Sequence, residues 1–440
     1  MRTNLAVKRD PIFTHEGARS VHITPEQALR RSVLSCMLWE REFYEDGKSI
    51  ADRIAELANQ VKPETVAALA REARGPFNLR HAPLMLLSVL AEMAQGSLVS
   101  DAIANVLQRA DEPGELLALH AKRVGKSIKK AMTHAMRKGI ARALTKFDEY
   151  QLGKYDRAAQ VRLRDVLFLT HPKSKERQEL WDKLAANELA TPDTWEVELS
   201  AGKDKRGTFE RLIREDNLGY LALLRNLRNM VEAGCDLDLV RGAILARKGA
   251  HRVLPFRYVA AACAAPQLEP VIDQALCAAI GEAKPLDGKT VVLVDVSGSM
   301  NEKLSAKSDM TRIDAAAALA SIVTGDVRVF TFSNAMVEVP PRRGMAGVDA
   351  VIKSQRHSGT FLGKAIEALN ANVKCDRLIV ITDEQSHDSV PASIAERAYM
   401  VNVASAKNGV GYGPWLHIDG FSEAVLRFIH EIERDASRVG

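Results

Sequence analysis

Aromatic residues are scarce in this chain of 440 residues, at 5%, which argues against a nucleic-acid surface built from many base-stacking side chains. Long apolar runs are also missing: none reaches about 18 residues, so no membrane span is expected. The five cysteines are widely spread and form no CxxC motif, so a disulfide framework and a zinc site lack support. The opening segment, MRTNLAVKRDPIFTHEG, has a proline and charges where a signal peptide needs an apolar stretch. We therefore expect a cytoplasmic protein.

Acidic residues are rare in one segment of the chain. Between Lys122 and Arg177 there are 16 Lys and Arg but only 5 Asp and Glu, a local net charge of +11. Because the whole chain carries +5, the remainder has a net charge of −6. Positive charge concentrated in one segment is typical of a protein that binds a polyanion.

Residues 20 to about 280 have the pattern of successive helices. The segment TPEQALRRSVLSCMLW places Thr24 as an N-cap and Pro25 at the first helical position. Apolar residues then recur at helical spacing as far as Met37. Further segments of roughly 12 residues follow, joined by short connections. This pattern predicts paired helices stacked as an α-solenoid.

The pattern changes at GEAKPLDGK, residues 281–289, which we interpret as a linker or domain edge. After it, short apolar segments alternate with amphipathic ones. We expect strands in KTVVLVDV, VRVFTFS, AMVEVP, DRLIVITD and YMVNVAS, and helices in RIDAAAALASIV, FLGKAIEALN, PASIAERA and SEAVLRFIHEI. This alternation predicts a mostly parallel sheet with helices on both faces, in which ligands bind at the carboxyl ends of the strands.

Oxygen-bearing side chains stand at those strand ends. Asp295, Ser297 and Ser299 follow the first strand as a D-x-S-x-S motif, Thr360 precedes a helix, and Asp383 ends a later strand. Taken alone, the D-x-S-x-S segment is more simply interpreted as a hydrogen-bonded turn. Together, two carboxylates and three hydroxyls make a set suited to a hard cation. We therefore predict a site for Mg²⁺ or another divalent cation.

This three-part arrangement resembles the metal-ion-dependent adhesion site (MIDAS) of von Willebrand factor A domains, over residues 288–440. The resemblance implies that Ser297, Ser299 and Thr360 contact the metal directly and that Asp295 and Asp383 act directly or through water. It also implies that an acidic group of a partner takes a free coordination position. Because these motifs contain no nucleophile with an oriented base, we predict a binding site and not an enzyme.

The segment HAKRVGKSIKKAMTHAMRKGIARALTKF carries the densest positive charge. On one continuous helix, four lysines share a face by their spacing: Lys122, Lys126, Lys129 and Lys130. Met132 and Met136 fall on the opposite side and would face a core. A second basic cluster follows at Arg157, Arg162, Arg164, Lys173 and Lys175. A solvated helix face and a phosphate-binding face both stay open on charge alone.

Several blocks make a second resemblance specific. GKSIKKAM (125–132) followed by RDVLFLTHPK (164–173) is similar to the central signature of the TROVE module. LALLRNLRNM (221–230) and LPFRYVAA (254–261) resemble its later blocks, and TPEQALRRSVLSCMLWEREFYEDG resembles its opening block. With an A-type domain following, nearly the whole chain resembles the Ro60-type (Rsr-like) proteins.

The resemblance implies a multidomain chain. A TROVE module at residues 1–284 would form an all-α ring of HEAT-like helical repeats, and a Rossmann-like α/β von Willebrand factor A domain at 285–440 would close it. It also implies a monomeric ring that binds Y RNA and the single-stranded 3′ ends of misfolded non-coding RNAs in RNA quality control. Y RNA can further tether such a protein to an exoribonuclease, polynucleotide phosphorylase.

Carried over by position, the RNA contacts of the family correspond to five residues: Lys126, Lys129, Lys130, Arg164 and His171. The predicted RNA-binding set adds their basic neighbours Lys122, Arg123, Arg137 and Lys173. Many relatives have a histidine where this chain has Leu163. His171 has a simpler alternative, since a histidine before a proline at a helix end can cap backbone carbonyls.

We thus predict a non-catalytic RNA-binding ribonucleoprotein component. The alternative is an Mg²⁺-dependent protein–protein adaptor that acts through the A-type domain. A metal-dependent phosphohydrolase is the least favoured, because the motifs provide neither a general base nor a carboxylate cluster suited to two metals.

Overall fold

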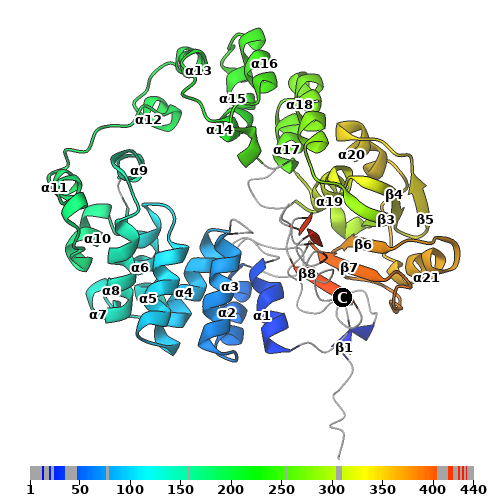
Figure 1. Cartoon of the computed structure of the whole chain (residues 1–440), viewed down its shortest axis with the longest axis horizontal. Coiled ribbons are helices and arrows are strands. Elements are labelled where there is room, and N and C mark those ends of the chain that lie inside the picture. Colours follow the sequence, from blue (N-terminus) through cyan, green and yellow to red (C-terminus); the bar gives the residue numbers. More distant parts are fainter. Residues whose placement is uncertain are drawn as a thin grey trace, which may run out of the picture. The chain divides into compact units, whose positions relative to one another are not determined.

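The computed structural model describes residues 12–13, 19–20, 24–34, 47–75, 79–156, 159–253, 255–303, 310–403, 415–419, 425–426, 429–430 and 433. They form two compact units that divide the chain between Ala275 and Leu276 (Figure 1). The division lies inside a helix, α18, and the domain boundary at 284/285 stays a prediction. The short antiparallel strands β1 (Ile12–Phe13) and β2 (Arg19–Ser20) group with the second unit.

Helices build the first unit. Its first half contains α1 (Pro25–Leu34), α2 (Gly47–Ala58), α3 (Pro63–Arg74), α4 (His81–Met93), α5 (Ser97–Val106), α6 (Glu112–Arg123), α7 (Ile128–Ala131), α8 (His134–Leu144), α9 (Glu149–Tyr155), α10 (Leu163–Thr170) and α11 (Gln178–Ala186). The helix predicted from Pro25 is confirmed as far as Leu34, and Cys36 and Met37 lie outside the described residues.

The second half of this unit continues with shorter helices. They are α12 (Trp195–Ser200), α13 (Lys205–Arg214), α14 (Tyr220–Arg225), α15 (Leu227–Glu232), α16 (Leu237–Ala246) and α17 (Phe256–Ala264), and α18 (Glu269–Gly281) spans the division. Local sequence accounts for many helix ends. In α3, for example, Pro63 stands in the first turn and Arg71 and Arg74 in the last, where they complement the helix dipole.

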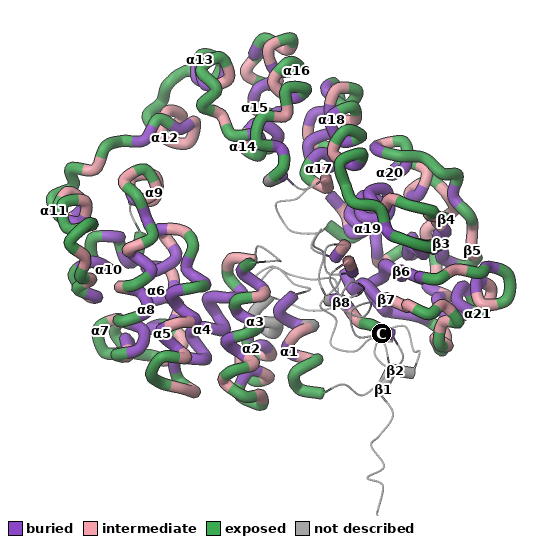
Figure 2. Tube along the Cα trace, in the orientation of Figure 1, coloured by how far each residue is buried: buried purple, intermediate pink, exposed green. Residues whose placement is uncertain are grey.

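One apolar core runs through the first half of the helical unit, from Leu29 to Leu184. Neighbouring helices pack in pairs such as α1 with α2, α3 with α4 and α5 with α8. Many of these helices bury one side and expose the other, whereas α4 is buried from Ala82 to Ala91 (Figure 2). The predicted succession of paired helices is confirmed for these residues.

A six-stranded sheet forms the centre of the second unit. Its strands are β3 (Leu286–Asp295), β4 (Gly325–Phe332), β5 (Met336–Val339), β6 (Arg377–Thr382), β7 (Arg397–Asn402) and β8 (Leu416–Asp419). Their order is β5-β4-β3-β6-β7-β8, and every pair is parallel except β4 with β5. The predicted Rossmann-like α/β architecture is confirmed, with α18 ending at Gly281 and β3 beginning at Leu286.

Side chains of β3 alternate between two covered faces. Val291 and Leu293 lie in a core with residues of α21 (Leu362–Asn372). Val292 and Val294, also buried, point to the other face, where α19 (Arg312–Ile322) packs on β3 and on α20 (Gly344–Ile352). β3 lies between β4 and β6, so the strand order reverses at β3. Ligands of such sheets bind at the carboxyl ends of the strands at this point, so we expect a ligand at the carboxyl end of β3.

The elements of this unit differ from the sequence prediction in one helix that does not form and in two elements that were not predicted. The helix predicted in PASIAERA does not form: residues 391–396 are irregular and β7 begins at Arg397. Long-range bonds explain this, because the Asn370 side chain donates to the Ala392 carbonyl at 2.9 Å and accepts from the Ile394 amide at 3.0 Å. The sequence also missed α20 and β8. Most of the closing helix predicted in SEAVLRFIHEI lies outside the described residues.

No helix in the described ranges is long and apolar enough to cross a membrane.

Candidate functional site: a cation site and a basic surface

The predicted metal-binding side chains lie at one end of the sheet. β3 ends at Asp295, and Asp383 follows β6 directly. The Thr382 hydroxyl donates to Asp295 Oδ2 at 2.6 Å, and the Ser297 amide donates to Asp295 Oδ1 at 2.8 Å. The hydroxyls of Ser297 and Ser299 are 3.3 Å apart. Parallel pairing of β3 with β6 therefore brings the D-x-S-x-S turn beside Asp383.

Asp295 and Asp383 are both fully buried. Burial raises the pKa of Asp295, and the neighbouring Asp383 carboxylate raises it further, to about 7. Burial also raises the pKa of Asp383, although hydrogen bonding by Ser299 and the charge of Arg312 act in the opposite direction. Two buried carboxylates that repel each other are stabilised by a nearby cation.

Backbone bonds hold the Thr360 loop against the other two loops. The Gly298 amide donates to the Ser358 carbonyl at 2.9 Å, and so joins the first loop to the second. The His387 amide donates to the Thr360 carbonyl at 2.8 Å, and the Thr360 amide donates to His387 Nδ1 at 3.1 Å. Thr360 itself is buried. All five predicted metal-binding residues therefore belong to loops that are bonded to one another.

Asp388 positions the helix that follows Thr360, a role that the sequence did not reveal. Its two carboxylate oxygens each accept a backbone bond at 2.8 Å, from Gly363 and Lys364 in the first turn of α21. A Cβ added to Gly363 would lie 2.1 Å from the Ser389 carbonyl oxygen, so only glycine allows this approach. Local cap signals cannot predict such a bond, because Asp388 lies 25 residues after Gly363.

The donor set fits a hard cation such as Mg²⁺. Asp383 Oδ2 is buried and has no hydrogen-bond partner among the described residues, which leaves it for a metal. Both oxygens of Asp295 already accept hydrogen bonds, which suits a carboxylate that holds a metal-bound water. Oxygen donors favour Mg²⁺ over softer ions. In the described part of the chain, no cluster of three or more His, Cys, Asp or Glu offers another metal site.

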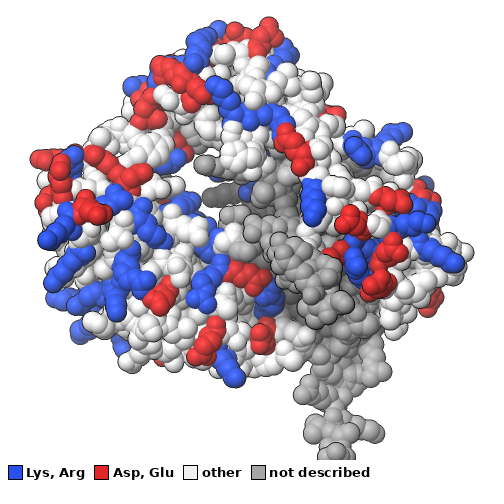
Figure 3. Space-filling view, in the orientation of Figure 1, with Lys and Arg blue, Asp and Glu red and all other residues white. Residues whose placement is uncertain are grey.

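A second feature is a continuous group of exposed cations on the helical unit, here called the basic surface. It consists of Lys122, Lys126, Lys129, Lys130, Arg137, Lys138, Arg164 and Lys173. Figure 3 shows Lys and Arg side chains gathered over α7, α8 and α10. α10 packs against both α6 and α8, and α7 packs against α6. None of the eight makes an ion pair within the described residues.

The sequence predicted that the lysines of the basic surface share one continuous helix, and the structure contradicts this. α6 ends at Arg123, Gly125 adopts a left-handed φ of 66°, and the separate helix α7 begins at Ile128. The glycine allows this sharp break, which would strain other residues. The expected core side is confirmed, because Met132 and Met136 are buried.

Two residues near the basic surface, Arg123 and Leu163, make contacts inside the helical unit. Arg123 donates to the Ser88 hydroxyl and carbonyl at 2.8 and 2.9 Å and pairs with Glu92 at 2.7 Å. Its guanidinium therefore joins α6 to α4. Leu163, where many relatives have a histidine, is 4% exposed and packs in the core of the unit.

In the second basic cluster, Arg162 precedes α10, Arg164 lies in it, and Lys173 and Lys175 follow it, whereas Arg157 lies outside the described residues. Arg164 and Lys173 are exposed, and so is His171, which caps the helix in a left-handed conformation with φ of 47°. The His171 amide donates to the Leu167 carbonyl at 3.0 Å. Its backbone therefore ends the helix, while its side chain is exposed.

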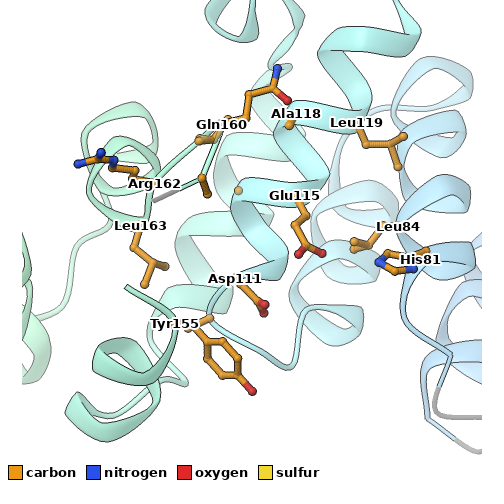
Figure 4. A pocket seen from close by; sticks show the side chains of 14 residues that line it. His81, Leu84, Asp111, Glu115, Ala118, Leu119, Tyr155, Gln160, Arg162 and Leu163 are labelled. Atoms are coloured by element: carbon orange, nitrogen blue, oxygen red, sulfur yellow. The ribbon is translucent and has the colours of Figure 1, made fainter. Parts of the chain in front are cut away.

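A pocket of about 470 Å³ opens beside α6 and the start of α10 (Figure 4). Asp111 and Glu115 line it, and both accept hydrogen bonds from Arg80. Arg109 pairs with Asp111 at 2.8 Å and lies 4.6 Å from the centre of the Tyr155 ring. Burial raises the pKa of Glu115. Because its acids are balanced by arginines, this pocket differs in charge from the basic surface.

Comparison with known proteins matches both units. A family described as TROVE domain matches residues 177–269, which include two of the five blocks that resemble the TROVE module, 221–230 and 254–261. A family described as VWA domain containing CoxE-like protein matches residues 279–411, which include all five candidate metal-binding residues. The two matches follow one another in the chain.

Among solved structures, the chain is similar to the Ro (Rsr) protein of Deinococcus radiodurans. The two are 17% identical, with a TM-score of 0.59 over 92% of this chain and 98% of that one. At that identity the likeness concerns the fold. A TROVE match followed by a von Willebrand factor A match, with this fold along nearly the whole length, supports a Ro60-type TROVE protein with a C-terminal von Willebrand factor A domain.

Proposed function

We propose that this protein is a non-catalytic, cytoplasmic RNA-binding protein. The observation that carries the proposal is the basic surface: eight exposed cations on or next to adjoining helices, without an ion-pair partner among the described residues. Like charges held together are unfavourable by themselves, whereas a phosphate backbone offsets them and releases counterions. The match to the TROVE domain family favours RNA as the polyanion.

The finer proposal is that the RNA is structured and carries unpaired ends. Y RNA and misfolded non-coding RNAs with single-stranded 3′ tails are the expected ligands. A role in RNA quality control would follow, with Y RNA as the tether to an exoribonuclease such as polynucleotide phosphorylase. We expect the protein to act as a monomer.

Reversing three lysines tests the RNA proposal. In the triple variant Lys126→Glu, Lys129→Glu, Lys130→Glu, RNA affinity should fall at least about a hundredfold, because phosphate contacts are replaced by repulsion. A gel-shift titration of the full chain with a hairpin RNA that carries a 3′ tail measures this. The three residues are exposed, so the thermal unfolding curve should stay near that of the wild type.

A matched control has the same change in net charge. Lys284, Lys289 and Lys374 are exposed in the α/β unit, near the amino ends of β3 and β6. Their reversal to glutamate should leave RNA affinity within about twofold of the wild type. Equal losses in both triple variants would show a net-charge effect and contradict a defined RNA surface.

A second candidate function concerns the cation site. We propose that Ser297, Ser299, Thr360 and Asp383 hold Mg²⁺ or another divalent cation, with Asp295 acting through water. The buried Asp383 oxygen without a partner supports this proposal. When bound, the cation would supply a positive point of attachment for an acidic group of a protein partner. An adaptor role of this kind is compatible with RNA binding, because the two sites use different residues.

A further inference from the structure

One aromatic side chain stands exposed among the cations of the basic surface. Phe168 in α10 is 49% exposed, although large apolar side chains elsewhere on this helix, such as Leu163 and Leu167, are buried. The Arg164 guanidinium lies 5.6 Å from the centre of the Phe168 ring, within the range of a cation–π contact. The ring therefore has one neighbour of positive charge and a large accessible area.

Two exposed residues of α10 share one side of the helix. Arg164 and Phe168 are spaced i and i+4, which places them on one face, and the exposed His171 follows directly as the residue that ends the helix. The opposite face packs in the core through Val166, Leu167 and Thr170. The cation of Arg164 and the ring of Phe168 thus form a stripe, here called the α10 stripe, and His171 stands at the end of the helix. Guanidinium planes and aromatic rings are both surfaces on which unpaired bases stack.

Charge identifies the partner of this stripe. The acid next to Arg164, Asp165, is bonded through its carboxylate to the Arg162 amide at 2.9 Å and so stays at the helix start. α10 packs against α8, whose exposed side chains include the cations Arg137 and Lys138. An apolar ring within a positive field suits a ligand that combines flat apolar faces with negative charge. A nucleotide has both, whereas a paired base in a duplex offers no free face.

We propose that the α10 stripe binds unpaired nucleotides of the RNA, with a base stacked on Phe168 and the phosphate beside it bound by Arg164. The proposal rests on the proposed RNA-binding function and adds the nucleotide class to it. The paired part of the RNA contacts the lysines of α6 and α7, and the unpaired part contacts α10. The stripe thus gives a preference for RNA with single-stranded segments over blunt duplex.

Two RNAs separate stacking from phosphate binding: a hairpin with a short 3′ oligoadenosine tail and the same hairpin with a blunt end. With the full chain, Phe168→Ala should weaken binding of the tailed hairpin about 5- to 150-fold, the range for loss of one base–aromatic stack. Binding of the blunt hairpin should change less than about twofold. The dependence on salt should stay that of the wild type, because no phosphate contact is removed.

Further variants distinguish stacking on an aromatic ring from contact with any apolar side chain of similar size. Phe168→Trp should keep the affinity for the tailed hairpin and Phe168→Leu should lose it, since leucine fills similar space without a π face. Tyr150, 51% exposed in α9 beside Asp148 and Glu149, provides the matched control, and Tyr150→Ala should bind as the wild type does.

Wild-type affinity of Phe168→Ala or Phe168→Leu for the tailed hairpin would overturn the stacking proposal alone. If the wild-type protein bound neither hairpin, the RNA-binding function itself would fail, and the stacking proposal with it.

Discussion

Asp295 and Asp383 place two buried carboxylates at one end of the sheet, where the proposed cation would offset their repulsion. Both are buried, and each raises the cost of ionising the other. The hydroxyls and amides around them act as hydrogen-bond donors to carboxylates, as with Ser297 and Thr382. Such an arrangement is stable when a positive charge joins it, because the repulsion between the carboxylates is then offset.

Asp383→Asn tests that dependence. With a chelator present, the variant should unfold at a higher temperature than the wild type, because one buried charge is removed. With free Mg²⁺ at about 100 times its dissociation constant, the wild type should gain ~2.7 kcal/mol in unfolding free energy and the variant almost none. Differential scanning fluorimetry with and without Mg²⁺ measures both effects. A Mg²⁺ response of the same size in both proteins would argue against a site at Asp383.

Elements are joined in this protein by side-chain bonds that cross between them. Asp388 holds the start of α21, Arg123 links α6 to α4, and Asn370 holds the loop before β7. A further case is Arg377 at the start of β6. It is fully buried and donates to the Asp287 carbonyl at 2.9 Å, to the Thr290 hydroxyl at 2.7 Å and to Glu433 at 2.6 Å.

Arg377→Ala should lower the unfolding free energy by about 3 kcal/mol at pH 7, because Glu433 loses its main buried partner. Burial alone would raise the pKa of Glu433, but bonds from Arg377 and Tyr399 hold it below its ordinary value. A lowered pKa means that the pair stabilises the fold above the unfolded value of about 4.5 and loses this effect as pH falls further. The difference between wild type and variant should therefore narrow below pH ~4.5, as measured by urea unfolding.

An exposed pair serves as the control for that experiment. Arg328 makes two bonds to Glu338 at 2.7 and 2.8 Å, and both side chains are about half exposed. Arg328→Ala should cost less than about 1 kcal/mol, because solvent screens the pair. Equal losses of unfolding free energy in Arg328→Ala and Arg377→Ala would show that burial does not strengthen the contribution of Arg377.

Positive charge is concentrated in one segment of the molecule, and the rest of the chain has a negative net charge. The segment from Lys122 to Arg177 has a net charge of +11, and the rest of the chain has −6. RNA affinity should therefore depend on salt far more than a net charge of +5 indicates. With six or more phosphate contacts, raising salt from about 50 to 200 mM should weaken binding about a thousandfold. Titrations of the tailed hairpin at several salt concentrations give this slope, and a flat dependence would contradict binding through the basic surface.

Much of this protein could be predicted from local pattern. The alternation of apolar and amphipathic segments predicted the sheet and most of its helices, because periods of 2 and 3.6 residues reflect burial directly. The acids at the ends of β3 and β6 predicted a cation site, since parallel strands end at one edge. The excess of Lys and Arg between residues 122 and 177 predicted the basic surface.

Contacts between distant residues decided the rest. Gly125 breaks the basic helix, Asn370 holds residues 391–396 in a loop where a helix was predicted, and Asp388 accepts a bond from Gly363, 25 residues earlier in the first turn of α21. Arg123 and Lys122 are neighbours of equal charge, yet only packing against Ser88 and Glu92 shows that Arg123 is a structural residue. Sequence determines which residues are able to bind a cation or RNA, because charge and period are local properties. Tertiary structure decides which of them are free to do so, because their hydrogen-bond partners come from elsewhere in the chain.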